Sequence, residues 1–166
     1  MENDLGIDRL LFVKIPVTDV AASARWYARL LDLRLAMEFI EDDELRGVVL
    51  VEPLTGIRLA LRDRAYSSSN PVLSGFDLLA FEMKSLLALE AFAKRCDSLG
   101  ITSTGVHYFD DGAGMDVPDP DGTAIRFHYA PGRPPFMVVR SGAESGQTAS
   151  QPVSYTHLTL PTICSV

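Results

Sequence analysis

The sequence predicts an α+β fold of two βαβββ modules that follow one another in a single domain. A strand-like alternation followed by a capped helix occurs twice, and the two copies are 66 residues apart. Three further strand-like segments follow the helix in each copy. We expect the modules at about residues 10–63 and 76–130, inside one domain that covers residues 1–132.

The first module begins with a strand at residues 11–17, where apolar side chains alternate with other residues. A helix is expected from an N-cap at Asp19 to about Leu31, because its apolar residues recur at helical spacing. The acidic run at 41–44 is typical of a solvated hairpin turn. The remaining strands of this module are expected at residues 35–40, 46–51 and 56–62.

The second module repeats this order, with a strand at residues 78–83 and a helix that Ser85 caps and Gly100 ends. A flexible loop is expected at residues 110–114, which are rich in Asp and Gly. The remaining strands are expected at residues 105–109, 114–117 and 122–128.

Composition narrows the function classes. The chain has 166 residues, 47% of them apolar, and no apolar run of about 18 residues that could span a membrane. Its N-terminus is acidic and polar, so we expect no signal peptide and a cytoplasmic location. A net charge of −7 disfavours nucleic acid and anionic membrane as partners. The two cysteines show no metal-ligand spacing.

The C-terminal segment differs from the rest of the chain. Residues 133–166 begin with a Pro-, Ser- and Gly-rich stretch that predicts a disordered tail. The last 14 residues or so resemble a translated cloning or sequencing sequence and are excluded from functional reasoning.

Three short motifs together resemble the vicinal-oxygen-chelate superfamily, which includes glyoxalases, bleomycin resistance proteins and extradiol dioxygenases. They are the strand end at residues 17–19, the helix segment at 23–27 and the Asp-Pro-Asp-Gly turn at 119–122. The resemblance implies that the modules pair curved mixed sheets around a central cleft. It also implies a small-molecule ligand and a homodimer.

The same resemblance indicates four inward positions where the metalloenzymes of this superfamily hold their metal. In this sequence they are occupied by Phe12, Ala60, Leu78 and Arg126. Three of these side chains have no donor atom, and arginine is permanently cationic. We therefore expect no metal and no cofactor.

The strand alternation predicts which side chains line the cleft. One interpretation is that Arg126 pairs with Glu82 and the two satisfy each other, and the other is that at least one of them contacts a ligand. The expected ligand-binding residues are Phe12, Lys14, Arg62, Leu78, Glu82, Arg126 and His128.

Three functions remain open. The leading hypothesis is a metal-independent small-molecule-binding protein that sequesters a ligand in the cleft. The alternative is a cofactor-free lyase, isomerase or hydrolase with His128 or Glu82 as catalytic base and Arg126 as anion stabiliser. The third is a metal-dependent glyoxalase or dioxygenase with displaced ligands. Its metal would be held by His107 and His128, with Glu52, Asp77 or Asp116 as the third ligand.

Overall fold

The protein forms two mixed four-stranded sheets, each with one helix, in a computed structural model that describes residues 6–132, 137–138 and 151–152. The first module consists of β1 (Val13–Val17), α1 (Val20–Leu31), β2 (Arg34–Glu41), β3 (Glu44–Val51) and β4 (Arg58–Asp63). After the short 3-10 helix η1 (Arg64–Tyr66), the second module consists of β5 (Asp77–Glu82), α2 (Leu86–Leu99), β6 (His107–Phe109), β7 (Gly112–Pro118) and β8 (Ala124–Tyr129). The predicted α+β fold of two βαβββ modules is confirmed.

Four residues beyond the second module are also described. They form two short strands, β9 (Met137–Val138) and β10 (Gln151–Pro152), which pair antiparallel. The rest of the predicted disordered tail, including the proposed cloning sequence, lies outside the described residues.

Strand pairing repeats between the modules. The sheets have the orders β1-β4-β3-β2 and β5-β8-β7-β6, with β1/β4 and β5/β8 parallel and the other neighbours antiparallel. Val13 lies opposite Leu59, and 66 residues later Leu79 lies opposite Ile125. The duplication expected from the sequence therefore extends to the register of the parallel strand pairs.

Capping side chains set the helix boundaries. Asp19 accepts a 2.9 Å hydrogen bond from the backbone N–H of Ala22 at the start of α1, and Ser85 accepts one from Ala88 at the start of α2. Gly100 ends α2 in the left-handed conformation that glycine adopts without strain. These are the boundaries that the sequence predicts.

One hydrophobic core lies between the helices and one face of each sheet. Its buried residues come from both modules and include Ile15, Val17, Leu59, Leu61, Val117 and Ile125. Cys96 is also buried there. We call the opposite side of each sheet, which carries the alternate residues of its strands, its open face.

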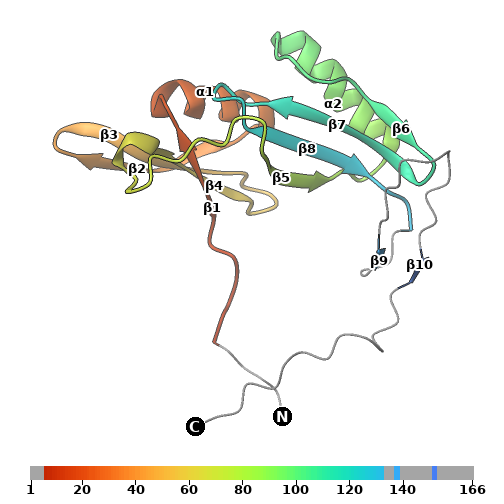
Figure 1. Ribbon diagram of the computed structural model, residues 1–166, viewed down its shortest axis with the longest axis horizontal. Coiled ribbons are helices and arrows are strands. Elements are labelled where there is room, and N and C mark those ends of the chain that lie inside the picture. Colours follow the sequence, from red (N-terminus) through yellow and green to blue (C-terminus); the bar gives the residue numbers. More distant parts are fainter. Residues whose placement is uncertain (1–5, 133–136, 139–150, 153–166) are drawn as a thin grey trace.

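The two modules lie side by side along the long axis of the molecule, and α2 lies over β7 and β8 (Figure 1). Arg95 of α2 connects the modules by donating to the carbonyl oxygens of Leu30 and Arg29 at 3.1 and 2.6 Å. These carbonyls belong to the last turn of α1, where a cation is favoured. No helix among the described residues is long and apolar enough to span a membrane.

Two sequence-based expectations fail locally. The predicted flexible loop at 110–114 is a tight turn at Asp110 and Asp111, because Gly112 already pairs with Phe109 in the β6–β7 hairpin. Leu78, expected to face the cleft, packs against the hydrophobic core. A register shift between Asp77 and Leu79 is the cause, since it breaks the alternation at this point.

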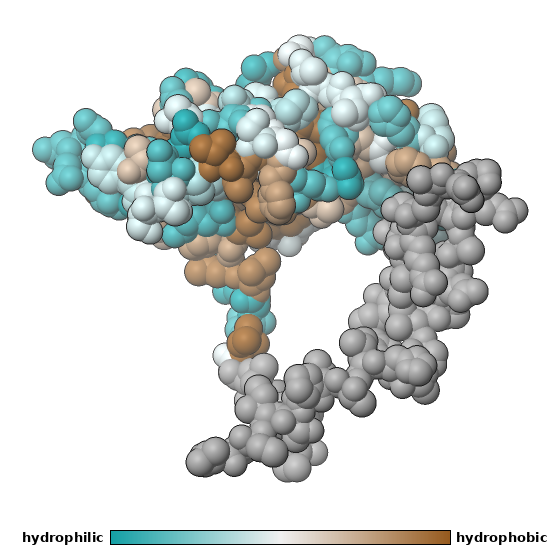
Figure 2. All heavy atoms as spheres, in the orientation of Figure 1, coloured by the Kyte–Doolittle hydropathy of each residue, from teal (hydrophilic) through white to brown (hydrophobic). Residues whose placement is uncertain are grey.

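Apolar surface remains exposed on the first module. All eight residues of the edge strand β2 are exposed, among them Leu35, Met37 and Ile40. The segment before β1 leaves the body of the molecule, and Figure 2 shows brown, hydrophobic atoms along it. In soluble proteins, exposed apolar side chains that gather in a large patch mark an interaction site.

Candidate functional site

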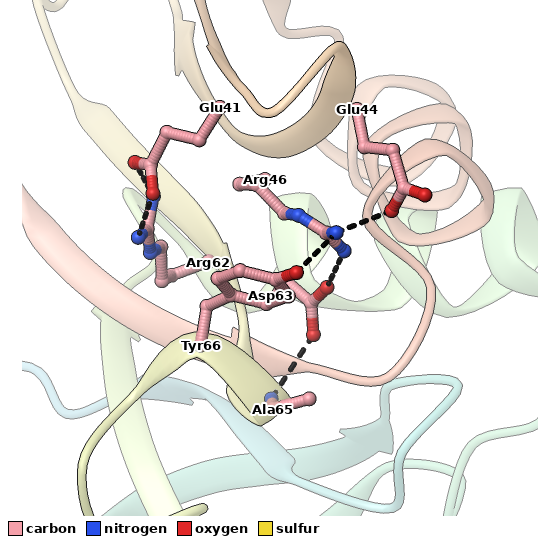
Figure 3. A network of polar contacts seen from close by, with 7 residues as sticks. All are labelled: Glu41, Glu44, Arg46, Arg62, Asp63, Ala65 and Tyr66. Carbon is pink, nitrogen blue, oxygen red and sulfur yellow. Dashed lines mark hydrogen bonds and ion pairs between the residues drawn. The ribbon is translucent and has the colours of Figure 1, made fainter.

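Two cationic side chains on the open face of the first module, those of Arg62 and Lys14, have partners within that module. Arg62 forms a two-point ion pair with Glu41, with N–O distances of 2.7 and 3.0 Å (Figure 3). This contact holds the pKa of Glu41 below its ordinary value. The ammonium of Lys14 lies 5.9 Å from the ring centre of Phe12. Strand register places Lys14 and Arg62 on the same face of the first sheet, with Phe12 beside Lys14.

Beside this pair, Arg46 belongs to a separate polar network at the edge of the core (Figure 3). Its guanidinium pairs with Asp63 at 3.0 Å and with Glu44, and lies 3.5 Å from the ring centre of Tyr66. Asp63 also accepts from the backbone N–H of Ala65. The network fixes η1 at the start of the connection between the modules, which is a structural role.

On the open face of the second module, Arg126 lies between two carboxylates. Its Nε and Nη2 donate to the two carboxylate oxygens of Asp116, both at 2.9 Å, and its Nη1 lies 2.7 Å from Oδ2 of Asp77. The hydrogen bonds that Arg126 donates to Asp116 raise the pKa of Arg126 above its ordinary value. The Arg126–Glu82 pair, one of the two interpretations of the sequence, is not formed, because Arg126 binds Asp116 and Asp77 instead.

A pocket of about 270 Å³ opens on this face, and we call it the open-face pocket. Thr104 helps to position Asp116, the acidic residue of the pocket, because the Thr104 hydroxyl accepts a 2.9 Å hydrogen bond from the backbone N–H of Asp116. The pocket is lined by Thr104, His107, Phe109, Gly114, Met115, Asp116, Arg126 and His128.

Two histidines flank a glycine in this pocket. His107, Gly114 and His128 lie opposite one another on three neighbouring strands, β6, β7 and β8. A Cβ atom at position 114 would lie 3.3 Å from Cδ2 of His128 and 3.5 Å from Cε2 of Phe109. The rings of Phe109 and His128 are stacked, with centroids 6.3 Å apart. Because Gly114 has no side chain, it leaves the space between the rings of Phe109 and His128 unfilled.

The first module contains a related arrangement. Gly47 lies opposite Arg62 as Gly114 lies opposite His128, and a Cβ atom at position 47 would meet the side chains of Phe39 and Arg62 at 3.4 and 3.6 Å. The duplication thus places a glycine beside a phenylalanine and a basic side chain on both open faces.

The structure brings together only part of the predicted site. Arg126 and His128 line the open-face pocket, whereas Phe12, Lys14 and Arg62 belong to the other sheet and Glu82 is not among the lining residues. Sequence reasoning missed Thr104, Phe109 and Gly114. Of these, Phe109 could have been predicted, because alternation along β6 places it on the same face as His107.

Of the candidate displaced metal ligands, His107 and Asp116 line the open-face pocket, but the candidates do not form a metal site. Within the described part of the chain, no three His, Cys, Asp or Glu side chains lie close enough to hold a metal ion. Asp77 and Asp116 both bind Arg126. Glu52 lies in the β3–β4 connection, where its carboxylate accepts from Thr55.

The family model of the Glyoxalase/Bleomycin resistance protein/Dioxygenase superfamily matches residues 6–127. No curated protein matches the chain. Solved structures similar to this fold include three that share little sequence identity with the chain. A member of the same superfamily from Sphaerobacter thermophilus is 18% identical, with a TM-score of 0.65 and coverage of 75% of this chain and 99% of that chain.

The antibiotic binding protein TnmS3 from Streptomyces sp. CB03234 is 17% identical, with a TM-score of 0.61 and coverage of 76% and 98% of the two chains. The genomically encoded fosfomycin resistance protein FosX from Listeria monocytogenes is 12% identical, with a TM-score of 0.58 and coverage of 75% and 94%. At these identities the likeness shows the fold alone.

Proposed function

The chain belongs to the Glyoxalase/Bleomycin resistance protein/Dioxygenase superfamily, and from this membership we propose that it binds and sequesters a small organic molecule without a metal. The observation that carries the proposal is the position of Arg126 between Asp77 and Asp116. The guanidinium supplies positive charge between two carboxylates, at one of the four positions where the resemblance implies a metal ligand.

The residues at those four positions do not fit a divalent metal ion. Phe12, Ala60 and Leu78 have no donor atoms, and Ala60 is also buried. A metal that used Asp77 and Asp116 would have to displace the guanidinium that already binds both carboxylates.

The open-face pocket favours a ligand with a planar ring and hydrogen-bonding groups. Phe109 and His128 offer stacked aromatic walls, and His107 and Thr104 offer polar atoms beside them. The similar fold of TnmS3, an antibiotic binding protein, supports ligand binding as a use of this fold.

A second candidate function is a cofactor-free enzyme that uses acid–base catalysis. The specific observation in its favour is that His107 and His128 flank Gly114 within one pocket, beside Arg126. Two imidazoles so placed can donate a proton to a bound substrate and remove one from it. Glu82, the other predicted base, does not line this pocket.

We further propose that the protein acts as a homodimer in which the open face of one module meets the other module of a second copy. The open faces carry opposite charge. The first carries the cations Lys14, Arg34, Arg58 and Arg62, and the anion Glu41 is paired with Arg62. The second carries three anions, Asp77, Glu82 and Asp116, and one cation, Arg126.

The function is tested by thermal unfolding of the metal-stripped full chain, with micromolar Ni²⁺, Zn²⁺, Mn²⁺ or Fe²⁺ and then with a panel of small aromatic and antibiotic compounds. A compound at about one hundred times its dissociation constant should add about 2.7 kcal/mol of stability. We expect an organic compound, and no metal, to raise the midpoint. A rise with any metal would overturn metal independence.

Turnover of a stabilising compound separates the two candidate functions. Conversion of that compound by the wild-type chain, lost in both His107→Ala and His128→Ala, would establish the enzyme. Binding without conversion supports sequestration. Glu82→Gln is the matched control, because Glu82 lies on the same open face outside the pocket.

A further inference from the structure

A second cavity, of about 310 Å³, lies where the two modules meet on the helix side of the sheets, and we call it the module-boundary cavity. Both modules contribute to its lining. The first supplies Leu30, Leu33 and Ile57, and the second supplies Phe81, Phe92 and Phe127.

The aromatic part of the lining is a preformed cluster. The rings of Phe81 and Phe127 are stacked with centroids 5.5 Å apart, and those of Phe92 and Phe127 are 4.2 Å apart. Phe81 and Phe92 are only partly buried, so the cluster is accessible from the cavity. A further flat ring can extend such a cluster by offset or edge-to-face contact.

This cavity is distinct from the open-face pocket. Phe127 lines the module-boundary cavity, and it alternates along β8 with Arg126 and His128, which line the open-face pocket. The cavity and the pocket therefore lie on opposite sides of this strand. A ligand in one would be separated from a ligand in the other by the thickness of the sheet.

The charged residues that line the cavity are already engaged or solvated. The carboxylate of Glu52 accepts from the backbone N–H of Leu54 at 3.1 Å and from the N–H and hydroxyl of Thr55, and these contacts hold its pKa below its ordinary value. Arg95 is bonded to the α1 carbonyls, and Asp32 is exposed. A charged ligand would lose hydration here without gaining a partner.

We propose that the module-boundary cavity binds an uncharged molecule of one or two fused aromatic rings. An apolar cavity of about 150 Å³ binds benzene, so one of roughly twice that volume has room for two rings. The site is independent of the function proposed for the open faces.

The test uses indole as the probe, with indole-3-acetate as its charged counterpart, titrated into the full chain while methyl resonances are followed by NMR. We expect saturable shifts at Leu33, Ile57 and Met83, with the side-chain signals of His107 and His128 unchanged. Indole-3-acetate should bind at least about tenfold more weakly, because its carboxylate loses hydration while the guanidinium of Arg95 is already bonded to the α1 carbonyls. Shifts centred on the histidines would place the probe in the open-face pocket and overturn the proposal.

A matched pair of substitutions in one connection completes the test. Ile57→Trp fills the cavity and should weaken indole binding by about tenfold or more, since a bulky ring occupies the ligand's place. Leu54→Trp is the control, because Leu54 is 95% exposed and does not line the cavity. Equal indole affinity in the two variants, or no saturable binding to the wild-type chain, would overturn the proposal.

Discussion

The hydroxyl of Tyr27 donates a 2.8 Å hydrogen bond to Oδ2 of Asp119, which joins α1 of the first module to the turn before β8 of the second. Both residues are buried. The other carboxylate oxygen of Asp119 accepts from the backbone N–H groups of Asp121 and Thr123 at 2.9 and 2.8 Å. Burial raises the pKa of both Tyr27 and Asp119.

Tyr27→Phe should therefore destabilise the protein. Removing the hydroxyl leaves a buried carboxylate oxygen without its donor, which costs about 1–3 kcal/mol of unfolding free energy. Urea unfolding at neutral pH measures the loss. Tyr108→Phe is the control, because the hydrogen bond from Tyr108 to Glu90 lies at the surface and its removal should change stability by less than about 0.5 kcal/mol.

Asp119→Asn should alter how stability depends on pH. Burial raises the folded-state pKa of Asp119 above 3.8. The resulting contribution of Asp119 to the free energy of unfolding is therefore fully present below that pH, and it is lost as the pH rises through the folded-state pKa. Asparagine stays neutral throughout. Urea unfolding between about pH 3.5 and 7 should show the variant gaining stability relative to wild type as pH rises. A difference that does not vary with pH would contradict this account.

The related glycines Gly47 and Gly114 should respond differently to alanine. At position 47 the added Cβ would lie 2.9 Å from the carbonyl oxygen of Leu61, and this backbone is fixed by strand pairing. Gly47→Ala should cost about 1–3 kcal/mol of unfolding free energy. Gly114→Ala meets a movable histidine ring at 3.3 Å, so it should cost less and mainly narrow the open-face pocket. Equal losses in urea unfolding would contradict the comparison.

Charge reversal tests the proposed homodimer. Lys14→Glu or Glu82→Lys places like charges on open faces that should meet, so each should weaken association, and the double reversal should restore part of it. Sedimentation of the full chain gives the oligomeric state. Lys94→Glu, on the exposed side of α2, is the control. A wild-type chain that stays monomeric at micromolar concentration would contradict the proposal.

Salt should weaken the same association. The screening length falls from about 10 Å at 0.1 M to about 3 Å at 1 M ionic strength, so attraction between the open faces is largely lost at high salt. A dimer whose dissociation constant is insensitive to salt would be held by apolar surface, such as that of β2, and not by these charges.

Much of the fold was predictable because its signals are local. The caps at Asp19 and Ser85, the alternation of the strands and the 66-residue repeat each depend on residues that are close in sequence or repeated at a fixed spacing. Leu78 was misplaced because a register shift is a property of paired strands, which alternation in one strand does not reveal.

The sequence by itself determined the two-module architecture, the family and the lack of donor atoms at Phe12, Ala60 and Leu78. Tertiary structure alone decided that Arg126 binds Asp77 and Asp116 and that Glu82 lies elsewhere. The reason is that an ion pair depends on which strands are neighbours and in what register. The same holds for the module-boundary cavity, which exists only because two separately encoded modules pack against each other.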